Sequence, residues 1–438
     1  MLKRAMIFGP TDRRPAAMST ISVAAPGSVY APPSSSTALE PVAPGERIQA
    51  LDLLRGWAMF GVLWSNLNDW YGTTDETTRF DRILSFSQEW LVESRFYTLL
   101  CFLFGIGFGI QLMRAAERGT SLQRTYIRRS AALLGIGLIH GLLIWRGDIL
   151  TLYALVSFAL LLFRDRTPRQ QLAWAVVIAL FASEVIVRVR WLAGQRYMVP
   201  RESSTTANWI YGHGSYAQIA HQRVYDFADW WGRFGLVTYF SVLAMFLAGV
   251  WAIRSGFARR VFSDPRTTRR FLAGCIVVAL IGYAMEVFGA QVLSPGRAPQ
   301  QTTMSVMLSW RRFVFHLLDW SVEAGGLAYA AALLLMFQTK RGARVLAPLA
   351  ATGRMALTTY LTQSVVCTTL FYSYGFRLAG RVGYTGMFVI TVTLFAVQMA
   401  VSVWWLKRYR FGPVEWLWRT LTYGRAPAMR VKPTVEPA

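Results

Sequence analysis

Charged residues are scarce in this chain, and acidic ones are the scarcer kind. Only 16% of the 438 residues are charged, whereas a soluble domain carries about 25%. Lys and Arg number 46 against 23 Asp and Glu, which leaves a net charge of +23. Apolar residues make up 54% of the sequence, and its mean hydropathy is +0.34. This composition argues against a water-soluble globular protein.

Cysteine is nearly absent. The three cysteines, Cys101, Cys275 and Cys367, lie in separate apolar stretches. Their wide spacing matches neither a disulfide framework nor a set of metal ligands, so no metal site is expected. We expect all three to be small buried residues of apolar segments.

Long apolar segments are what the chain has in abundance. A helix needs about 20 apolar residues to cross a hydrocarbon core about 30 Å thick. Segments of this kind lie at 50–69, 92–113, 128–145, 148–164, 171–192, 234–253, 271–291, 315–337, 356–376 and 384–406. The sequence therefore predicts an all-α, polytopic integral membrane protein with about ten transmembrane helices and the lipid bilayer as its partner.

The remaining segments are polar. Residues 1–46 are rich in proline and serine and lack apolar periodicity, so we expect a disordered tail there, and a second one at 426–438. Between these tails, 47–425 is predicted to form the transmembrane bundle. The polar and aromatic stretch 193–233 is predicted to be an extramembrane loop with some short helix.

The basic residues indicate which side of the membrane each connection occupies. Counted over the tails and alternate short connections, about thirty Lys and Arg fall on one side and about eight on the other. Because basic residues accumulate on the cytoplasmic side, both termini are predicted to be cytoplasmic and the number of spans even. These charges are spread over six separate segments, so nucleic-acid binding is not expected.

Polar side chains inside apolar spans are costly and commonly functional. The sharpest pair is His140 and Asp148, on either side of a predicted tight hairpin turn. Asp148 would orient the imidazole and leave its second nitrogen as a base. Asn66, near the outer end of the first span, would donate a hydrogen bond to an oxyanion. The alternative is that His140 bonds a neighbouring backbone and Asp148 caps the fourth helix.

Two further sets of polar residues allow two interpretations each. His316, Asp319 and Glu323 occur at i, i+3 and i+7, so they share one helix face. This stripe would relay protons or hold a cation, or it is a polar face at the membrane boundary. Arg55 either pairs with Asp52 on its own helix or binds a phosphate group that enters from the cytoplasm.

The glycine-rich run 104–109 lies in the middle of an apolar segment. No strand precedes it, so it is not a dinucleotide-binding loop. Gly105 and Gly109 share one helix face, and we expect them to allow close packing of a neighbouring helix.

Five separated blocks together resemble the YeiB-like family of bacterial inner-membrane proteins. The blocks are LDLLRG at 51–56, FLFGIG at 102–107, GDILTLYA at 147–154, GRMALTTYLTQS at 353–364 and GPVEWLWR at 412–419. The resemblance runs from about residue 47 to 425 and is weakest over 193–310. It implies a multi-pass protein of the inner membrane whose carboxyl-terminal part is a domain of unknown function.

That family is similar to a wider group of membrane acyltransferases, which move acyl groups onto sugars or amino sugars. The similarity implies a helical bundle with an internal active site and acyl-CoA as a co-substrate, without a permanently bound cofactor. Many of those enzymes have a histidine in or just after the first span. Here Asn66 occupies that neighbourhood, so His140 is the substitute candidate.

The leading hypothesis is therefore a membrane acyltransferase that moves an acyl group from a CoA-like donor to an acceptor in the envelope. His140, Asp148 and Asn66 are its candidate catalytic residues. The candidates for binding the substrate or the donor are Arg55, Gln363 and Tyr153.

The alternative hypothesis is a transporter for a small solute. Its path would be lined by polar residues of the later spans: Glu286, His316, Asp319, Glu323 and Gln363.

Overall fold

The computed structural model describes residues 48–71, 78–92, 94–192, 204–293 and 310–431. Within these ranges the chain is helical apart from turns, loops and one β-bridge between Tyr409 and Arg430. The longer helices are α1 (Gln49–Tyr71), α3 (Arg95–Glu117), α4 (Gln123–Ile139), α5 (Leu150–Leu160), α6 (Pro168–Leu192), α9 (Leu236–Arg254), α11 (Pro265–Leu293), α13 (Trp310–Phe337), α16 (Ala356–Phe371) and α17 (Tyr384–Leu406). Shorter helices are α2 (Arg79–Ser87), α7 (Ser204–His213), α8 (Tyr216–Trp230), α10 (Phe257–Ser263), α14 (Lys340–Val345), α15 (Ala347–Arg354) and α18 (Pro413–Tyr423).

Every predicted apolar segment falls on a helix, so the all-α prediction is confirmed. Among the described residues, five helical runs are long and apolar enough to cross a membrane: Arg79–Glu117, Gln123–Ile144, Tyr216–Arg254, Pro265–Met285 and Tyr384–Leu406. The chain is therefore a helical membrane protein. Ten crossings and two cytoplasmic termini stay predictions.

The predicted loop at 193–233 is helical in its described part apart from the turn at Gly214 and Ser215. Helices α7 and α8 form its described part, and α8 runs through a single π-helical turn, η5 (Trp231–Gly235), into α9 without a break. The boundary expected at residue 234 is thus absent, because the aromatic residues of α8 continue the apolar helix. The extramembrane position of the segment stays a prediction.

The carboxyl-terminal tail also differs from expectation, because its first residues pair with the end of α17. Arg410 N donates to Met429 O at 2.8 Å, and Val431 N donates to Arg408 O at 3.1 Å. These main-chain bonds order the chain as far as Val431. The other predicted tail, 1–46, and residues 432–438 lie outside the described residues.

Helices α3 and α9 pack closely because each presents a glycine to the backbone of the other. A Cβ on Gly105 would lie 2.0 Å from Phe246 O, and one on Gly249 would lie 2.2 Å from Phe102 O. Gly109, one turn further along α3, lies against Ile253 of α9. The packing role predicted for Gly105 and Gly109 is confirmed, and all three cysteines are buried as predicted.

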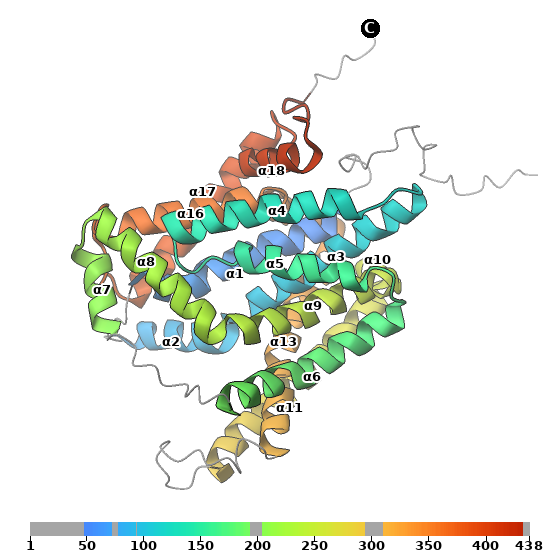
Figure 1. The fold of residues 1–438 in the computed structure, drawn as a ribbon, viewed down its shortest axis with the longest axis horizontal. Coiled ribbons are helices and arrows are strands. Elements are labelled where there is room, and N and C mark those ends of the chain that lie inside the picture. The colour runs from blue at the N-terminus through green and yellow to red at the C-terminus, as the bar shows by residue number, and fades with distance from the viewer. Residues whose placement is uncertain (1–47, 72–77, 93, 193–203, 294–309, 432–438) are drawn as a thin grey trace, which may run out of the picture. The chain divides into compact units, whose positions relative to one another are not determined.

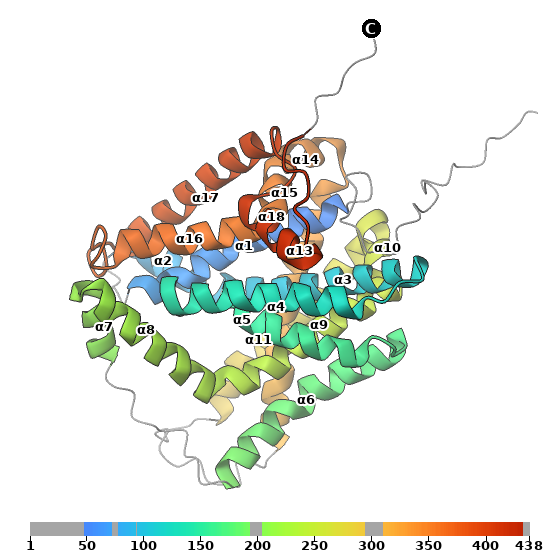
Figure 2. The ribbon, with the colours of Figure 1, turned by 45° about the horizontal axis from the view of Figure 1, so that its top comes forward.

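The short helix α18, which follows α17 in the chain, packs against both α16 and α4 (Figures 1 and 2). Glu415 on α18 accepts hydrogen bonds from Leu357 N at 2.7 Å, from Thr358 N at 3.1 Å and from the Thr358 hydroxyl. Trp418 donates its indole N–H to Arg129 O at 2.9 Å, and the Arg129 guanidinium lies 3.7 Å from the centre of the Trp418 ring. The 353–364 and 412–419 blocks therefore meet where α16 begins.

The glycine contact predicts that Gly105→Ala destabilises the fold. The new methyl group would overlap main-chain atoms of α9, and overpacking of this kind costs about 1–3 kcal/mol. Thermal unfolding of the protein in detergent should show a lower Tm. Gly107→Ala is the matched control, because a Cβ there meets only Arg55 Nη2 at 3.5 Å. Equal Tm values for the two variants would contradict the packing argument.

The buried carboxyl of Glu415 predicts a dependence of stability on pH. Burial raises the pKa of Glu415. The folded protein therefore binds the carboxyl proton of Glu415 more tightly than the unfolded chain does. This difference contributes to the free energy of unfolding at low pH, and the contribution is lost as pH rises through the raised pKa. The glutamine of Glu415→Gln cannot ionise. The Tm of this variant, relative to that of the wild type, should therefore rise as pH increases from about 5 to about 8. A gap between the two that is independent of pH would disprove this.

Candidate active site

The turn between α4 and α5 brings two polar side chains together. Helix α4 ends in a π-helical turn, η3 (His140–Ile144), and α5 begins at Leu150. The two helices approach closely because Gly137 has no side chain; a Cβ there would lie 2.5 Å from Thr151 N. The predicted tight hairpin is present, and it holds the start of η3 beside Asp148.

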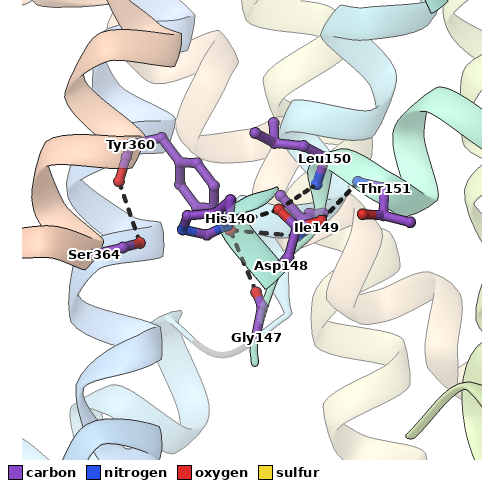
Figure 3. Close-up of polar contacts among 8 residues, drawn as sticks. All are labelled: His140, Gly147, Asp148, Ile149, Leu150, Thr151, Tyr360 and Ser364. Atoms are coloured by element: carbon purple, nitrogen blue, oxygen red, sulfur yellow. Dashed lines mark hydrogen bonds and ion pairs between the residues drawn. The ribbon is translucent and has the colours of Figure 1, made fainter. Parts of the chain in front are cut away.

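His140 and Asp148 form a buried pair (Figure 3). His140 Nδ1 lies 2.7 Å from Asp148 Oδ1, and the two side chains are 1% and 0% exposed. The same carboxyl group accepts hydrogen bonds from Leu150 N at 3.2 Å and from Thr151 N at 2.7 Å. Asp148 therefore both caps α5 and orients the imidazole. The two roles that the sequence allows as alternatives for Asp148 occur together.

In the neutral imidazole, the hydrogen bonds determine which nitrogen carries the proton. Both oxygens of Asp148 act as acceptors, so we assign the proton to His140 Nδ1 and a lone pair to Nε2. Nε2 is buried and has no hydrogen-bond partner among the described residues. A carboxylate that holds an imidazole in this way leaves Nε2 as a base. The site can therefore accept a proton from a hydroxyl or amine delivered to Nε2.

Tyr360 of α16 completes the surroundings of the imidazole, and sequence reasoning does not single it out. Its ring centre lies 5.1 Å from that of His140. Its hydroxyl donates to Gly147 O and accepts from Ile149 N, both at 3.3 Å, which joins α16 to the turn that carries Asp148 (Figure 3). Tyr360 belongs to the 353–364 block, but a tyrosine in an apolar helix carries no spacing signal that distinguishes it.

A second group of polar residues lies where α7 and α8 meet this hairpin. Arg146 Nη1 lies 3.0 Å from Asp226 Oδ2, which also accepts a hydrogen bond from the Tyr211 hydroxyl at 2.7 Å. Arg223 is fully buried beside η3, and its Nη1 donates to Leu142 O at 3.5 Å. Sequence reasoning misses these residues because it treats 193–233 as a loop. The helical spacing of aromatic residues over 216–230 is the signal that identifies the helix.

Asn66 forms no described hydrogen bond with the pair. Gly56 packs against Gly353, and Met59 O accepts a hydrogen bond from Gln363 Nε2 at 3.4 Å, so α1 runs in the same direction as α15 and α16. Asn66 lies seven residues beyond Met59, about 10 Å further along α1. Tyr360, which contacts the imidazole, lies one turn before Gln363 and therefore on the other side of Met59 from Asn66. No described hydrogen bond joins Asn66 to the pair, so its predicted catalytic role lacks structural support.

The other candidate binding residues have partners of their own. Arg55 Nη1 pairs with Asp52 Oδ1 at 3.3 Å, the intrahelical alternative. The Tyr153 hydroxyl lies 3.1 Å from Cys101 Sγ in the core. Gln363 also donates to Gln398 Oε1 at 3.0 Å. No described hydrogen bond joins any of the three candidates to His140.

The predicted polar stripe of α13 is only partly described. Glu323 is half-buried on that helix. The side chains of His316 and Asp319, and that of Glu286 on α11, lie outside the described residues. The stripe therefore stays a prediction.

A cavity of about 480 Å³ lies where α1 begins, between α14, α15 and the end of α17. Its polar lining consists of Gln49, Asp52, Arg354, Tyr409 and Arg410. Val431, from the ordered part of the tail, also lines it. The cavity thus combines two guanidinium groups with an apolar wall.

The hydrogen bonds of Asp148 predict that its two simplest substitutions differ in stability. Asp148→Ala leaves three donors without an acceptor, and each unsatisfied buried donor costs about 1–3 kcal/mol. Asp148→Asn keeps an oxygen that caps a helix nearly as well as a carboxylate. Thermal unfolding in detergent should therefore show a much larger loss of Tm for the alanine variant. Equal losses would contradict the capping role.

Comparison with known proteins places the chain in a family. Residues 252–425 match the family model described as "Protein of unknown function (DUF418)". The uncharacterized protein YxaH of Bacillus subtilis (strain 168) is 32% identical over 412 residues, which cover 88% of this chain and 97% of YxaH. The uncharacterized protein YeiB of Escherichia coli (strain K12) is 29% identical over 401 residues, covering 86% and 96%. The chain therefore belongs to the YeiB-like family of membrane proteins.

Proposed function

We propose that this protein is a membrane acyltransferase whose general base is His140. The observation that carries the proposal is the buried His140–Asp148 pair, in which Nε2 has no hydrogen-bond partner among the described residues. A histidine with a purely structural role is expected to use both nitrogens, since an unsatisfied buried polar atom costs about 1–3 kcal/mol. An unpartnered Nε2 is instead available to an incoming substrate.

The proposed reaction transfers an acyl group from a thioester to a hydroxyl or amine. The acceptor atom attacks the thioester carbonyl carbon while His140 Nε2 takes its proton. The carbon–sulfur bond then breaks, and the imidazolium returns the proton to the leaving thiolate. Asp148 stays hydrogen-bonded to Nδ1 throughout and stabilises the imidazolium.

The cavity at the start of α1 is the proposed site for the phosphate-bearing end of an acyl-CoA donor. Arg354 and Arg410 supply the guanidinium groups that phosphates prefer. Asp52 lines the cavity and pairs with Arg55, which puts Arg55 at its edge. Arg354 ends α15, and Tyr360, which contacts His140, lies in the next helix, α16. An extended pantetheine arm that follows the start of α16 from the cavity would bring the thioester to His140.

Replacement of His140 tests the proposal. His140→Gln removes the base with little change in volume, and general-base catalysis contributes at least about 100-fold to rate. We expect the transfer of label from radiolabelled acetyl-CoA to envelope material in proteoliposomes to fall by about that factor. His221→Gln on α8 is the matched control, because His221 is exposed, and it should transfer label at the wild-type rate.

Two results would contradict the proposal. One is wild-type transfer by a folded His140→Gln variant. The other is solute flux through proteoliposomes that show no label transfer, which is the behaviour expected of a transporter.

A further inference from the structure

Arg223 is a buried cation that forms no ion pair with the described residues. Its side chain is 0% exposed. The acid one turn along α8, Asp226, is occupied by Arg146 and Tyr211. A charge removed from water costs several kcal/mol unless an opposite charge balances it. Such a residue therefore points to an anion that is not part of the described chain.

The guanidinium presents one unused edge. Its Nη1 donates to Leu142 O at 3.5 Å, whereas Nε and Nη2 have no hydrogen-bond partner among the described residues. The N–H groups of Nε and Nη2 lie side by side and point in the same direction. Two such donors match two oxygens of a carboxylate or a phosphate.

Two partly exposed tyrosines lie beside the Arg223 guanidinium. The Tyr216 ring centre lies 6.0 Å from Arg223 Cζ, and the Tyr374 phenol interacts with both Arg223 and Thr368. The two rings pack against each other with centres 5.5 Å apart, and they are 49% and 39% exposed. The guanidinium therefore lies next to side chains that reach the surface, and rotation of these side chains would open it.

Arg223 and His140 contact the same turn of the chain. His140 is the first residue of η3, and Leu142, two residues later, accepts the hydrogen bond from Arg223. Gly141, between them, lies against α8; a Cβ there would be 2.9 Å from Phe227 Cε2. Both views show α7 and α8 beside the ends of α4 and α16 (Figures 1 and 2).

We propose that Arg223 binds a carboxylate or phosphate group of the molecule on which His140 acts. The proposed acceptor is thus an acidic one, either a soluble molecule or a lipid whose phosphate headgroup carries a net negative charge. The identification of the acceptor rests on the proposed function, whereas the anion site itself does not.

The test measures thermal unfolding of the full chain in neutral detergent by tryptophan fluorescence. Inorganic phosphate, compared with chloride at equal ionic strength, should raise the Tm of the wild type by a few degrees. Arg223→Lys should show a smaller increase, because an ammonium group keeps the charge but lacks the paired donors. When both proteins are measured in phosphate-free buffer, Arg223→Met should have a higher Tm than the wild type, because the substitution removes an unbalanced buried charge.

Arg233→Gln is the matched control: it removes an arginine from η5, which directly follows α8, and leaves Arg223 in place. Arg233 Nε pairs with Asp229 Oδ1 at 2.6 Å and does not take part in the proposed site. This variant should keep the increase in Tm with phosphate.

Mixed micelles that contain phosphatidylglycerol or phosphatidylcholine distinguish the two sources of the anion. An increase in Tm with phosphatidylglycerol alone identifies a lipid headgroup, and an increase with inorganic phosphate identifies a soluble ligand; both support the site. No increase in the wild type with either additive, or an equal increase in Arg223→Lys, overturns it. Because this readout is binding and not acyl transfer, its failure is distinct from a failure of the His140→Gln experiment.

Discussion

The candidate active site depends on one carboxyl group that is held away from water. A buried carboxylate without donors would cost several kcal/mol, so the fold must surround Asp148 with them. It does so with the His140 imidazole and two main-chain N–H groups at the start of α5. All three belong to one helical hairpin, and the close approach at Gly137 brings them within reach. The same contacts that make the hairpin stable therefore determine the direction of the imidazole.

Acidic residues are scarce in this chain, and several of them stabilise the start of a helix. Asp148 caps α5, and Glu415 caps α16 from a distant part of the chain. The Asp81 carboxyl accepts hydrogen bonds from Thr78 N, at the cap of α2, and from Thr385 N, in the first turn of α17. The Asp264 carboxyl accepts two from the first turn of α11. The first N–H groups of a helix have no acceptor within the helix, so each of these carboxyl groups supplies a missing partner. These four acidic residues thus serve the backbone as hydrogen-bond acceptors.

Local features of the sequence predict much of this fold and part of the site. The lengths of the apolar segments locate the helices. His140 and Asp148 are only eight residues apart, on either side of a turn, so their pairing can be predicted from the sequence. Contacts between distant segments are not predictable in this way. Tyr360 and Arg223 reach the hairpin from 211 and 81 residues away, by the docking of whole helices. The catalytic role predicted for Asn66 lacks support for the same reason, since the alignment of α1 with α16 depends on packing that no local pattern encodes.

We propose that His140 is a neutral imidazole whose hydrogen bond to Asp148 leaves Nε2 without a proton. Nitrogen-15 NMR of protein labelled in histidine tests this directly, because the two neutral tautomers of imidazole give different spectra. The signal of His140 can be assigned by its loss in His140→Gln. We expect the tautomer with the proton on Nδ1 and none on Nε2. A tautomer with the proton on Nε2 would contradict it.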